Sequence, residues 1–395
     1  MQVPDRKKLA IISSHPIQYN APLFRLLTER NRVAVKVFYT WGQTREGIVY
    51  DPEFRQSFQW DIPLTEGYAA EFIDNTARRP GADHFNGIQN KDLIEKIDAY
   101  DPDALLVYGW SFRSHLQVIR HFKGRRKILF RGDSTLLNEG DQALWKRMLR
   151  RLFLRWVYRH VDIALYTGVA NQAYYRAHGI SAPQLYYAPH AVENERFSTN
   201  CEQWEVRARE ERKLLGIPEE ALVFLYAGKF FPLKQLDLLV KSFQQLAGDT
   251  YRLLFYGTGE QENYLKELSR EDPRIIFQPF RNQSDMPWVY RTGDVFVLPS
   301  RSETWGLGVN EAMACGRTAV VSDRCGCAAD LIVPGKTGFV FRSGDAADLL
   351  RCLKASGDKE KVLEMGEAAA RHIASYCLEA IARVVEAVVE GGERM

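Results

Sequence analysis

The sequence predicts two α/β domains, each built on a doubly wound parallel sheet, and three observations lead to this prediction. Short apolar runs alternate with segments of helical period along the chain, which is the pattern of strand–helix–strand units. The alternation restarts after a polar stretch at residues 193–212. The length of 395 residues suits two domains, because a domain commonly holds roughly 100–200 residues.

The first domain is expected to span residues 1–192. Its predicted strands are Leu9–Ile12, Val33–Tyr39, Ala104–Tyr108, Lys127–Phe130, Ile163–Tyr166 and Gln184–Tyr187. Its predicted helices have apolar residues at helical spacing and are Pro22–Arg30, Lys91–Tyr100, Ser114–Phe122 and Gln142–His160. Residues 41–90 do not alternate cleanly and are rich in aromatic residues, so we interpret them as an insertion that borders a cleft.

The second domain is expected to span residues 193–376. Its predicted strands are Leu222–Ala227, Arg252–Tyr256, Arg274–Phe277, Val295–Leu298, Ala319–Ser322 and Gly338–Phe341. Its predicted helices are Leu233–Leu246, Glu260–Ser269, Gly308–Ala314, Ala346–Ala355 and Lys359–Ser375. Residues 377–395 form a last helix that we expect to pack back toward the first domain. Parallel sheets bind ligands beyond the carboxyl ends of their strands, so the two domains are expected to face each other across a substrate cleft.

The composition excludes several classes of protein. Apolar residues make up 46% and charged residues 26% of the chain, a balance that excludes disordered, collagen-like and coiled-coil proteins. The net charge of +3 argues against a nucleic-acid partner. Residues 1–192 hold 27 Lys and Arg against 19 Asp and Glu, whereas residues 193–395 hold 26 against 31, so the two domains are expected to meet different partners.

The location is expected to be cytoplasmic. No apolar run approaches the roughly 18 residues that span a bilayer, and the first apolar stretch is too short for a signal-peptide core. Cys325 and Cys327 form a C-x-C pair without further ligands nearby, so the six cysteines are interpreted as thiols in a reducing compartment.

The most informative stretch begins with the strand Val295–Leu298. Glu303 lies in the loop that follows, and Gly306 and Gly308 open a helix that contains Glu311. A helix N-terminus offers unpaired N–H groups and partial positive charge that suit a phosphate. Two carboxylates eight positions apart would flank that anion and accept hydrogen bonds from sugar hydroxyls. The alternative is a surface-loop glutamate and a helix-end glutamate without function.

Two lysines follow the first strand of the second domain. Lys229 and Lys234 flank a tight loop at the carboxyl end of Leu222–Ala227, where two ammonium groups would neutralise a diphosphate leaving group. Two solvated lysines on a surface loop are the alternative.

Together these residues resemble glycosyltransferase family 4, retaining enzymes of the GT-B fold, in its bacterial branch. The resemblance lies in Glu303 and Glu311, followed by the residues Ala312–Gly316, and in the lysine pair, where Lys229 replaces the usual Arg. It covers most of the second domain and, more loosely, the first.

The resemblance implies the roles of the donor-site residues. Glu303 would hold the donor sugar, Glu311 the ribose, and Lys229 and Lys234 the leaving diphosphate. The further donor contacts that it implies are Gly228, Gly257, Phe280, Gly306, Leu307 and Gly308. It implies retention by front-face attack and no required metal or other cofactor. Asp101–Asp103 has the D-x-D form of metal-dependent transferases, but it precedes a strand, where we expect a turn.

The activity implied is that of a hexosyltransferase, which moves a sugar from a nucleotide-sugar donor to a hydroxyl of a glycan or lipid-linked acceptor in cell-surface polysaccharide or glycolipid synthesis. One alternative is a nucleotide-sugar 2-epimerase of the same fold, which needs no acceptor. Another is a non-catalytic protein that binds a sugar nucleotide or a membrane surface. A Rossmann dehydrogenase is disfavoured, because no G-x-G-x-x-G follows the first strand.

The acceptor is expected to meet the first domain. His15 lies in a polar loop after the first strand and would act as a catalytic residue that orients or deprotonates the acceptor hydroxyl; alternatively, it caps the loop by hydrogen bonds. Many relatives carry a histidine where Tyr108 stands here. The acceptor-side residues that we predict are Tyr19, Tyr108, Arg131, Asp133 and His190.

One predicted helix carries six of the 27 basic residues of the first domain. No acid lies between Asp141 and Asp162, where six cations occur: Lys146, Arg147, Arg150, Arg151, Arg155 and Arg159. At about 100° per residue, an apolar face opposite is formed by Trp145, Met148, Leu149, Leu152, Phe153 and Trp156. One interpretation buries the apolar face beneath a solvated basic face. The other docks the basic face, through Lys146, Arg147, Arg150 and Arg151, on the anionic inner face of a membrane.

Overall fold

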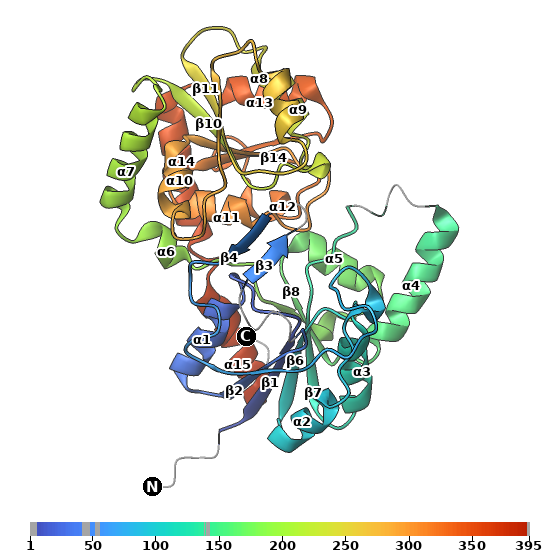
Figure 1. Cartoon of the computed structure of the whole chain (residues 1–395). Coiled ribbons are helices and arrows are strands. Elements are labelled where there is room, and N and C mark those ends of the chain that lie inside the picture. Colours follow the sequence, from blue (N-terminus) through green and yellow to red (C-terminus); the bar gives the residue numbers. More distant parts are fainter. Residues whose placement is uncertain (1–5, 42–47, 52–55, 138, 140–142, 393–395) are drawn as a thin grey trace. The chain divides into compact units, whose positions relative to one another are not determined.

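In the computed structural model the chain divides into two compact units. The first domain comprises Met1–Ile48, Ile62–Pro189 and Leu378–Met395, and the second comprises Val49–Asp61 and His190–Cys377. The structure describes residues 6–41, 48–51, 56–137, 139 and 143–392 (Figure 1). The division after Pro189 lies close to the boundary expected at residue 193.

The first domain is built on a seven-stranded parallel sheet in the order β5-β2-β1-β6-β7-β8-β9. Its strands are β1 (Lys8–Ser13), β2 (Ala34–Tyr39), β5 (Ala69–Phe72), β6 (Ala104–Tyr108), β7 (Lys127–Arg131), β8 (Ile163–Tyr166) and β9 (Leu185–Tyr187). All six predicted strands form. The seventh, β5, comes from the expected insertion, where β3 (Ile48–Asp51) and β4 (Gln56–Gln59) also make a separate two-stranded sheet.

Helices cover both faces of this sheet (Figure 1). Side chains alternate along β1, and Ala10 and Ile12 join the hydrophobic core cluster that includes residues of α2 and α3. Helices α1 and α15 pack against each other. The helices are α1 (Ala21–Arg30), α2 (Leu93–Tyr100), α3 (Arg113–Phe122), α4 (Leu144–Tyr158), α5 (Val169–Ala177) and α15 (Leu378–Glu390), with 3-10 turns η2 (Phe85–Gly87) and η3 (Ala182–Gln184).

The last helix is anchored to the first domain by polar contacts. The carboxylate of Glu386 is fully buried and accepts two hydrogen bonds of 2.8 Å from the guanidinium of Arg30. Lys127 donates to the carbonyl oxygen of Val388 at 2.8 Å. Helix α15 therefore forms part of this domain, although it ends the chain.

The second domain has a six-stranded parallel sheet in the order β12-β11-β10-β13-β14-β15. Its strands are β10 (Leu222–Ala227), β11 (Tyr251–Tyr256), β12 (Ile275–Gln278), β13 (Val295–Leu298), β14 (Thr318–Ser322) and β15 (Gly338–Phe341). Its helices are α6 (Asn194–Ser198), α7 (Cys201–Leu214), α8 (Leu236–Phe243), α9 (Glu262–Leu268), α10 (Met286–Thr292), α11 (Leu307–Ala314), α12 (Ala328–Leu331), α13 (Ala346–Ala355) and α14 (Lys359–Ile373). The fold class predicted from the sequence is therefore confirmed.

Two local elements were not predicted as the structure has them. The polar stretch at residues 193–212 contains helices α6 and α7, because polar residues along α7 pair with distant partners, such as Glu205 with Arg317. The helix expected to begin at Leu233 begins at Leu236, because the 3-10 turn η4 (Pro232–Lys234) and Gln235, at φ 50°, come first.

Helix α4 reverses the burial expected of its two faces. Leu154, Val157 and Tyr158 pack into the domain, whereas most of the predicted apolar face is exposed. Two apolar stripes exist on this helix, and only the shorter one, near its carboxyl end, reaches the core. The interpretation that the longer stripe is buried is wrong.

The D-x-D carboxylates have separate partners: Asp101 pairs with Arg126, and Asp103 accepts a hydrogen bond from Lys7 at 2.8 Å. All six cysteines are free thiols, and burial raises the pKa of Cys325 to about 12. In the part of the chain that the structure describes, no helix is long and apolar enough to span a bilayer.

Candidate functional site

Four loops meet at the carboxyl edge of the second sheet, because the strands that they follow are neighbours in the order β12-β11-β10-β13. The predicted donor-site residues on these loops are Gly228, Lys229 and Lys234 after β10, Gly257 after β11, Phe280 after β12, and Glu303, Gly306, Leu307 and Gly308 after β13. This edge is where parallel α/β sheets bind ligands.

The loops after β10 and β11 touch through glycine. A Cβ on Gly257, which has φ 147°, would lie 1.9 Å from the carbonyl oxygen of Gly228. Phe230 N–H donates to the carbonyl oxygen of Thr258 at 2.9 Å. Residue 257 must therefore be glycine for the loops to approach this closely.

Lys234 and Glu303 form an ion pair across the edge. Their loops are also joined by the main chain, since Arg301 N–H donates to the carbonyl oxygen of Leu233 at 2.8 Å. The side chains of Lys234 and Glu303 are 22% and 20% exposed, so each can contact a ligand as well as the other. Lys229 is half-buried on the same loop as Lys234.

The turn before α11 also requires glycine. Gly306 has φ 104°, and a Cβ there would lie 2.7 Å from a methyl group of Leu298. The turn directs the first N–H groups of α11, those of Leu307 and Gly308, away from any partner within the helix. A positive helix end and an ammonium group thus lie on neighbouring loops.

Glu311 lies on the buried side of α11. It is 2% exposed, accepts a hydrogen bond of 2.6 Å from the hydroxyl of Tyr290, and lies 4.0 Å from the guanidinium of Arg196. Its contact with a ribose stays a prediction, and such a contact would have to share this carboxylate with Tyr290.

His190 belongs to the second domain, not to the first, where its acceptor-side role was predicted. Its ring lies 5.6 Å from that of Trp305, and its carbonyl oxygen accepts a hydrogen bond of 2.9 Å from Asn310 on α11. The side chain of Asn310 accepts in turn from the indole of Trp305 at 2.8 Å. His190 is thus tied to the helix that follows the Glu303 loop.

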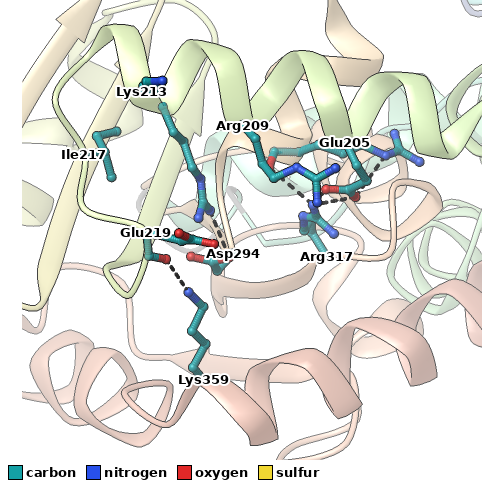
Figure 2. A pocket seen from close by; sticks show the side chains of 10 residues that line it. Glu205, Arg209, Lys213, Ile217, Glu219, Asp294, Arg317 and Lys359 are labelled. Carbon is teal, nitrogen blue, oxygen red and sulfur yellow. Dashed lines mark hydrogen bonds and ion pairs between the residues drawn. The ribbon is translucent and has the colours of Figure 1, made fainter.

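A cavity of about 560 Å³ lies elsewhere in the second domain (Figure 2). Ile217 and Asp294 line it and precede strands β10 and β13, so the cavity lies at the amino edge of the sheet. It is a different place from the predicted donor site. Its charged lining residues are Glu205, Arg209, Arg212, Lys213, Glu219, Arg291, Asp294, Arg317 and Lys359.

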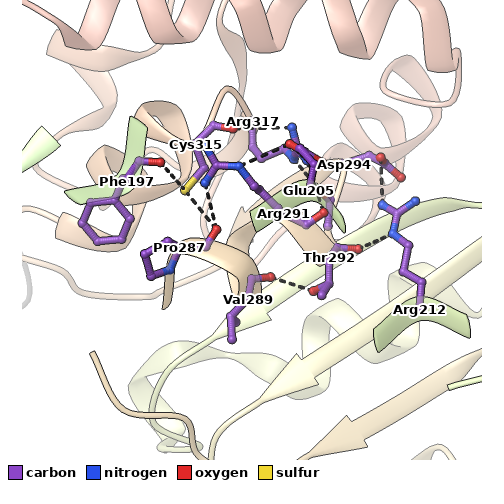
Figure 3. A network of polar contacts seen from close by, with 11 residues as sticks. Phe197, Glu205, Arg212, Pro287, Val289, Arg291, Thr292, Asp294, Cys315 and Arg317 are labelled. Carbon is purple, nitrogen blue, oxygen red and sulfur yellow. Dashed lines mark hydrogen bonds and ion pairs between the residues drawn. The ribbon is translucent and has the colours of Figure 1, made fainter. Parts of the chain in front are cut away.

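Ion pairs use much of this charge to hold α7 in place (Figure 3). Glu205 lies 3.3 Å from Arg291 and 2.7 Å from Arg317. Arg212 pairs with Asp294 at 2.9 Å and donates to the carbonyl oxygen of Thr292 at 2.8 Å. We interpret the cavity as bounded by structural contacts.

In the first domain, His15 lies in the loop after β1. Its Nδ1 is 2.9 Å from the hydroxyl of Ser14, and its ring packs edge-on against Trp41 at 5.9 Å. Burial lowers the pKa of His15 below its usual value, which favours the neutral imidazole that a general base requires. Tyr19 lies two residues before α1 and is half-buried.

A second histidine contacts the main chain of Tyr108 and was not predicted as a site residue. His115, on α3, is fully buried, with Nε2 2.9 Å from the hydroxyl of Thr40 and Nδ1 3.0 Å from the carbonyl oxygen of Tyr108. Burial lowers its pKa to about 4. Burial also raises the pKa of Tyr108 to about 12. His115 fixes the end of β6, and no local motif marked it.

Arg131 is 5% exposed and anchors main chain. Its guanidinium donates to the carbonyl oxygens of Ala188 and Pro189 at 2.8 and 2.9 Å. We therefore leave it out of the proposed acceptor contacts. Asp133 follows on the same loop and is half-buried.

The chain is similar in sequence to known glycosyltransferases. Residues 207–372 match the family described as Glycosyl transferases group 1. This segment holds all the donor-site loops. Sulfoquinovosyl transferase SQD2 of Arabidopsis thaliana is 32% identical over 228 residues, which are 56% of this chain and 43% of that protein. The chain spans less than half the length of the curated relatives that it matches.

Solved structures are similar over nearly the whole chain. Sucrose-phosphate synthase from Thermosynechococcus elongatus has 18% identity and a TM-score of 0.73, with 98% of this chain and 99% of that chain covered. HepE from Anabaena in complex with UDP-glucose has 16% identity and a TM-score of 0.68, with 97% and 99% covered. Both domains have the fold of the GT-B glycosyltransferases.

Proposed function

We propose that this protein is a retaining glycosyltransferase that transfers a sugar from a nucleotide-sugar donor to a hydroxyl of a glycan or lipid-linked acceptor, in cell-surface polysaccharide or glycolipid synthesis. The observation that carries the proposal is the Lys234–Glu303 pair beside the N-terminus of α11. The match of residues 207–372 to a glycosyltransferase family supports the reaction class, and the UDP-glucose complex of HepE supports a nucleotide-sugar donor.

In the proposed reaction the bond between the anomeric carbon and the diphosphate oxygen breaks, and a bond from the acceptor oxygen to that carbon forms. The diphosphate gains negative charge as it leaves. Lys234 and the N–H groups of Leu307 and Gly308 would stabilise that charge where it develops. Lys229 would assist from the same loop. The acceptor proton would pass to the leaving diphosphate oxygen, as front-face attack requires.

Glu303 would have two tasks. Its carboxylate would accept hydrogen bonds from donor-sugar hydroxyls, and it holds the ammonium of Lys234 in place. Since this cationic group and the helix end supply the positive charge, we propose that no metal is required. Six free cysteines support a cytoplasmic location.

Ligand-induced thermal shifts with UDP, GDP, ADP and dTDP sugars test donor binding, because a ligand that binds only the folded state raises the melting temperature. We expect one nucleotide series to raise it. Product analysis then separates the two enzyme classes. A transferase gives a glycoside with the donor's anomeric configuration only when acceptor is present, and keeps that activity in EDTA. A 2-epimerase changes the donor without acceptor, and a sugar-nucleotide binding protein changes nothing.

A further inference from the structure

Helix α4 has an exposed apolar face that the proposed reaction does not use. Its large apolar side chains are 42% to 75% exposed: Leu144, Trp145, Met148, Leu149, Leu152 and Phe153. Contiguous apolar surface of this kind is uncommon on a soluble monomer and marks a place of contact.

The geometry of the helix keeps this face away from the core. Leu154, Val157 and Tyr158 are buried, and at about 100° per residue they point opposite to Trp145, Met148 and Leu152. The apolar surface continues beyond the helix, because Phe153 packs at 5.4 Å against the ring of Trp110 and at 5.7 Å against that of Trp156. The helix therefore already packs against the core through one apolar stripe, and the exposed stripe is a second one.

The charge around this face has one sign. Lys146, Arg155 and Arg159 are exposed, and no acid occurs in residues 143–161. The ammonium of Lys146 lies over the ring of Trp145 at 5.5 Å, so a cation and an indole share one end of the stripe. Apolar side chains bordered by cations, with Trp among them, are typical of helices that lie in the headgroup region of a bilayer.

The other cations of α4 lie nearer to the domain, and Arg150 helps to attach the helix. Arg150 lies 3.5 Å from the buried carboxylate of Glu139 and donates to the hydroxyl of Tyr174 on α5 at 3.2 Å. Arg147 and Arg151 are half-buried on the same side. The basic residues expected from the sequence to meet lipid are therefore mostly those nearest to the domain.

We propose that α4 inserts its apolar face into the surface of an anionic membrane. Trp145, Met148, Leu149 and Leu152 would enter the acyl boundary, while Lys146, Arg155 and Arg159 contact lipid phosphates. A second copy of this chain is a poorer partner, because a symmetric contact would bring the same cations together. The inference does not depend on the proposed reaction, because membrane binding requires no donor sugar.

Vesicle flotation without nucleotide tests the proposal. The full chain is mixed with vesicles of phosphatidylcholine alone or with about a third phosphatidylglycerol. We expect binding to the anionic vesicles, weakened at least tenfold by the double variant Met148→Ser/Leu152→Ser and severalfold by Arg155→Gln/Arg159→Gln. Leu363→Ser on α14 is the matched control, because Leu363 and Leu152 are both 62% exposed; its binding should equal that of the wild type.

Three results would overturn the proposal. The first is that the protein binds neither kind of vesicle. The second is that the Met148→Ser/Leu152→Ser variant binds as well as the wild type, and the third is equal binding to neutral and anionic vesicles. Sedimentation velocity of the same proteins identifies the rival partner. Self-association that the apolar double variant abolishes would show that a second copy covers the face. Because the substituted side chains are exposed, unchanged melting temperatures will confirm that the variants are folded.

Discussion

The two parallel sheets place loops at their carboxyl edges in the same way, but these loops carry side chains of different chemistry. In the second domain the edge holds an ion pair, two glycine-dependent loops and a helix N-terminus. In the first domain it holds His15 and Tyr108, and the cation there, Arg131, donates to main-chain carbonyls. In the proposed reaction, the diphosphate would meet the charged edge and the acceptor hydroxyl would meet the edge of the first domain.

The largest effect expected is that of Lys234→Ala. If this ammonium stabilises the leaving diphosphate, its loss should lower kcat by about 10²- to 10³-fold, as loss of one preorganised donor does elsewhere, with a much smaller change in KM. Steady-state kinetics with the donor found by thermal shift measures this.

Lys266→Ala is the matched control, because Lys266 is an exposed lysine that also pairs with a glutamate, Glu262, at 2.7 Å. Its kcat should be that of the wild type. Wild-type turnover in Lys234→Ala would contradict the proposed role of the charged edge.

A smaller loss is expected from Gly257→Ala. The added Cβ would meet the carbonyl oxygen of Gly228 at 1.9 Å, so the two loops must separate. Donor affinity measured by calorimetry should fall at least tenfold. Gly216→Ala separates the effect of steric overlap from that of a positive φ. Gly216 also has positive φ (65°), but nothing lies within 4 Å of the added atom. If both variants bind donor like the wild type, close contact of the loops does not shape the site.

The fold could be predicted because its signals are local. Each strand of the second sheet is a short apolar run, and the turn from β13 into α11 shows its glycines within a few residues. The ion pair of Lys234 with Glu303 joins residues 69 positions apart, and His115 meets Thr40 across 75 positions. Only the fold brings such partners together, so sequence identified Lys234 and Glu303 as separate candidates and missed His115.

Burial was harder to predict than secondary structure. Helix α4 was expected from its period, but two apolar stripes compete on it, and periodicity does not state which one the domain covers. Helix α7 was missed for the opposite reason. It is polar on nearly every side, and its position depends on partners such as Arg317, 112 positions from Glu205.

The neutral state of His115 at the first edge can be tested by pH. Burial lowers the pKa of His115 to about 4, whereas an unfolded histidine has a pKa of about 6.5. Between these values the unfolded chain binds more protons, so stability is lost as pH falls from 6.5 toward 4. The expected loss is about 2 kcal/mol at pH 5, measured by urea unfolding at pH 7.5 and pH 5.

The variant His115→Gln should remove this pH-dependent part of the stability. His121→Gln on the same helix is the control and should retain it, because His121 is 30% exposed. An equal loss of stability with pH in wild type and His115→Gln would show that His115 is not held neutral, and the contrast between the two edges would weaken.

The smallest effect is expected from Arg131→Lys, which tests whether Arg131 anchors the main chain or contacts the acceptor. Its guanidinium donates to two carbonyl oxygens, of Ala188 and Pro189, and the single ammonium of a lysine cannot reproduce that fork. Arg131→Lys should therefore lower the free energy of unfolding by about 1 kcal/mol and leave KM for the acceptor unchanged. Arg126→Lys, at an ion pair with the 65% exposed side chain of Asp101, should change stability by less than about 0.5 kcal/mol. If Arg131→Lys instead raises KM for the acceptor at unchanged stability, Arg131 contacts the acceptor as the sequence predicted, and the first edge carries a working charge like the second.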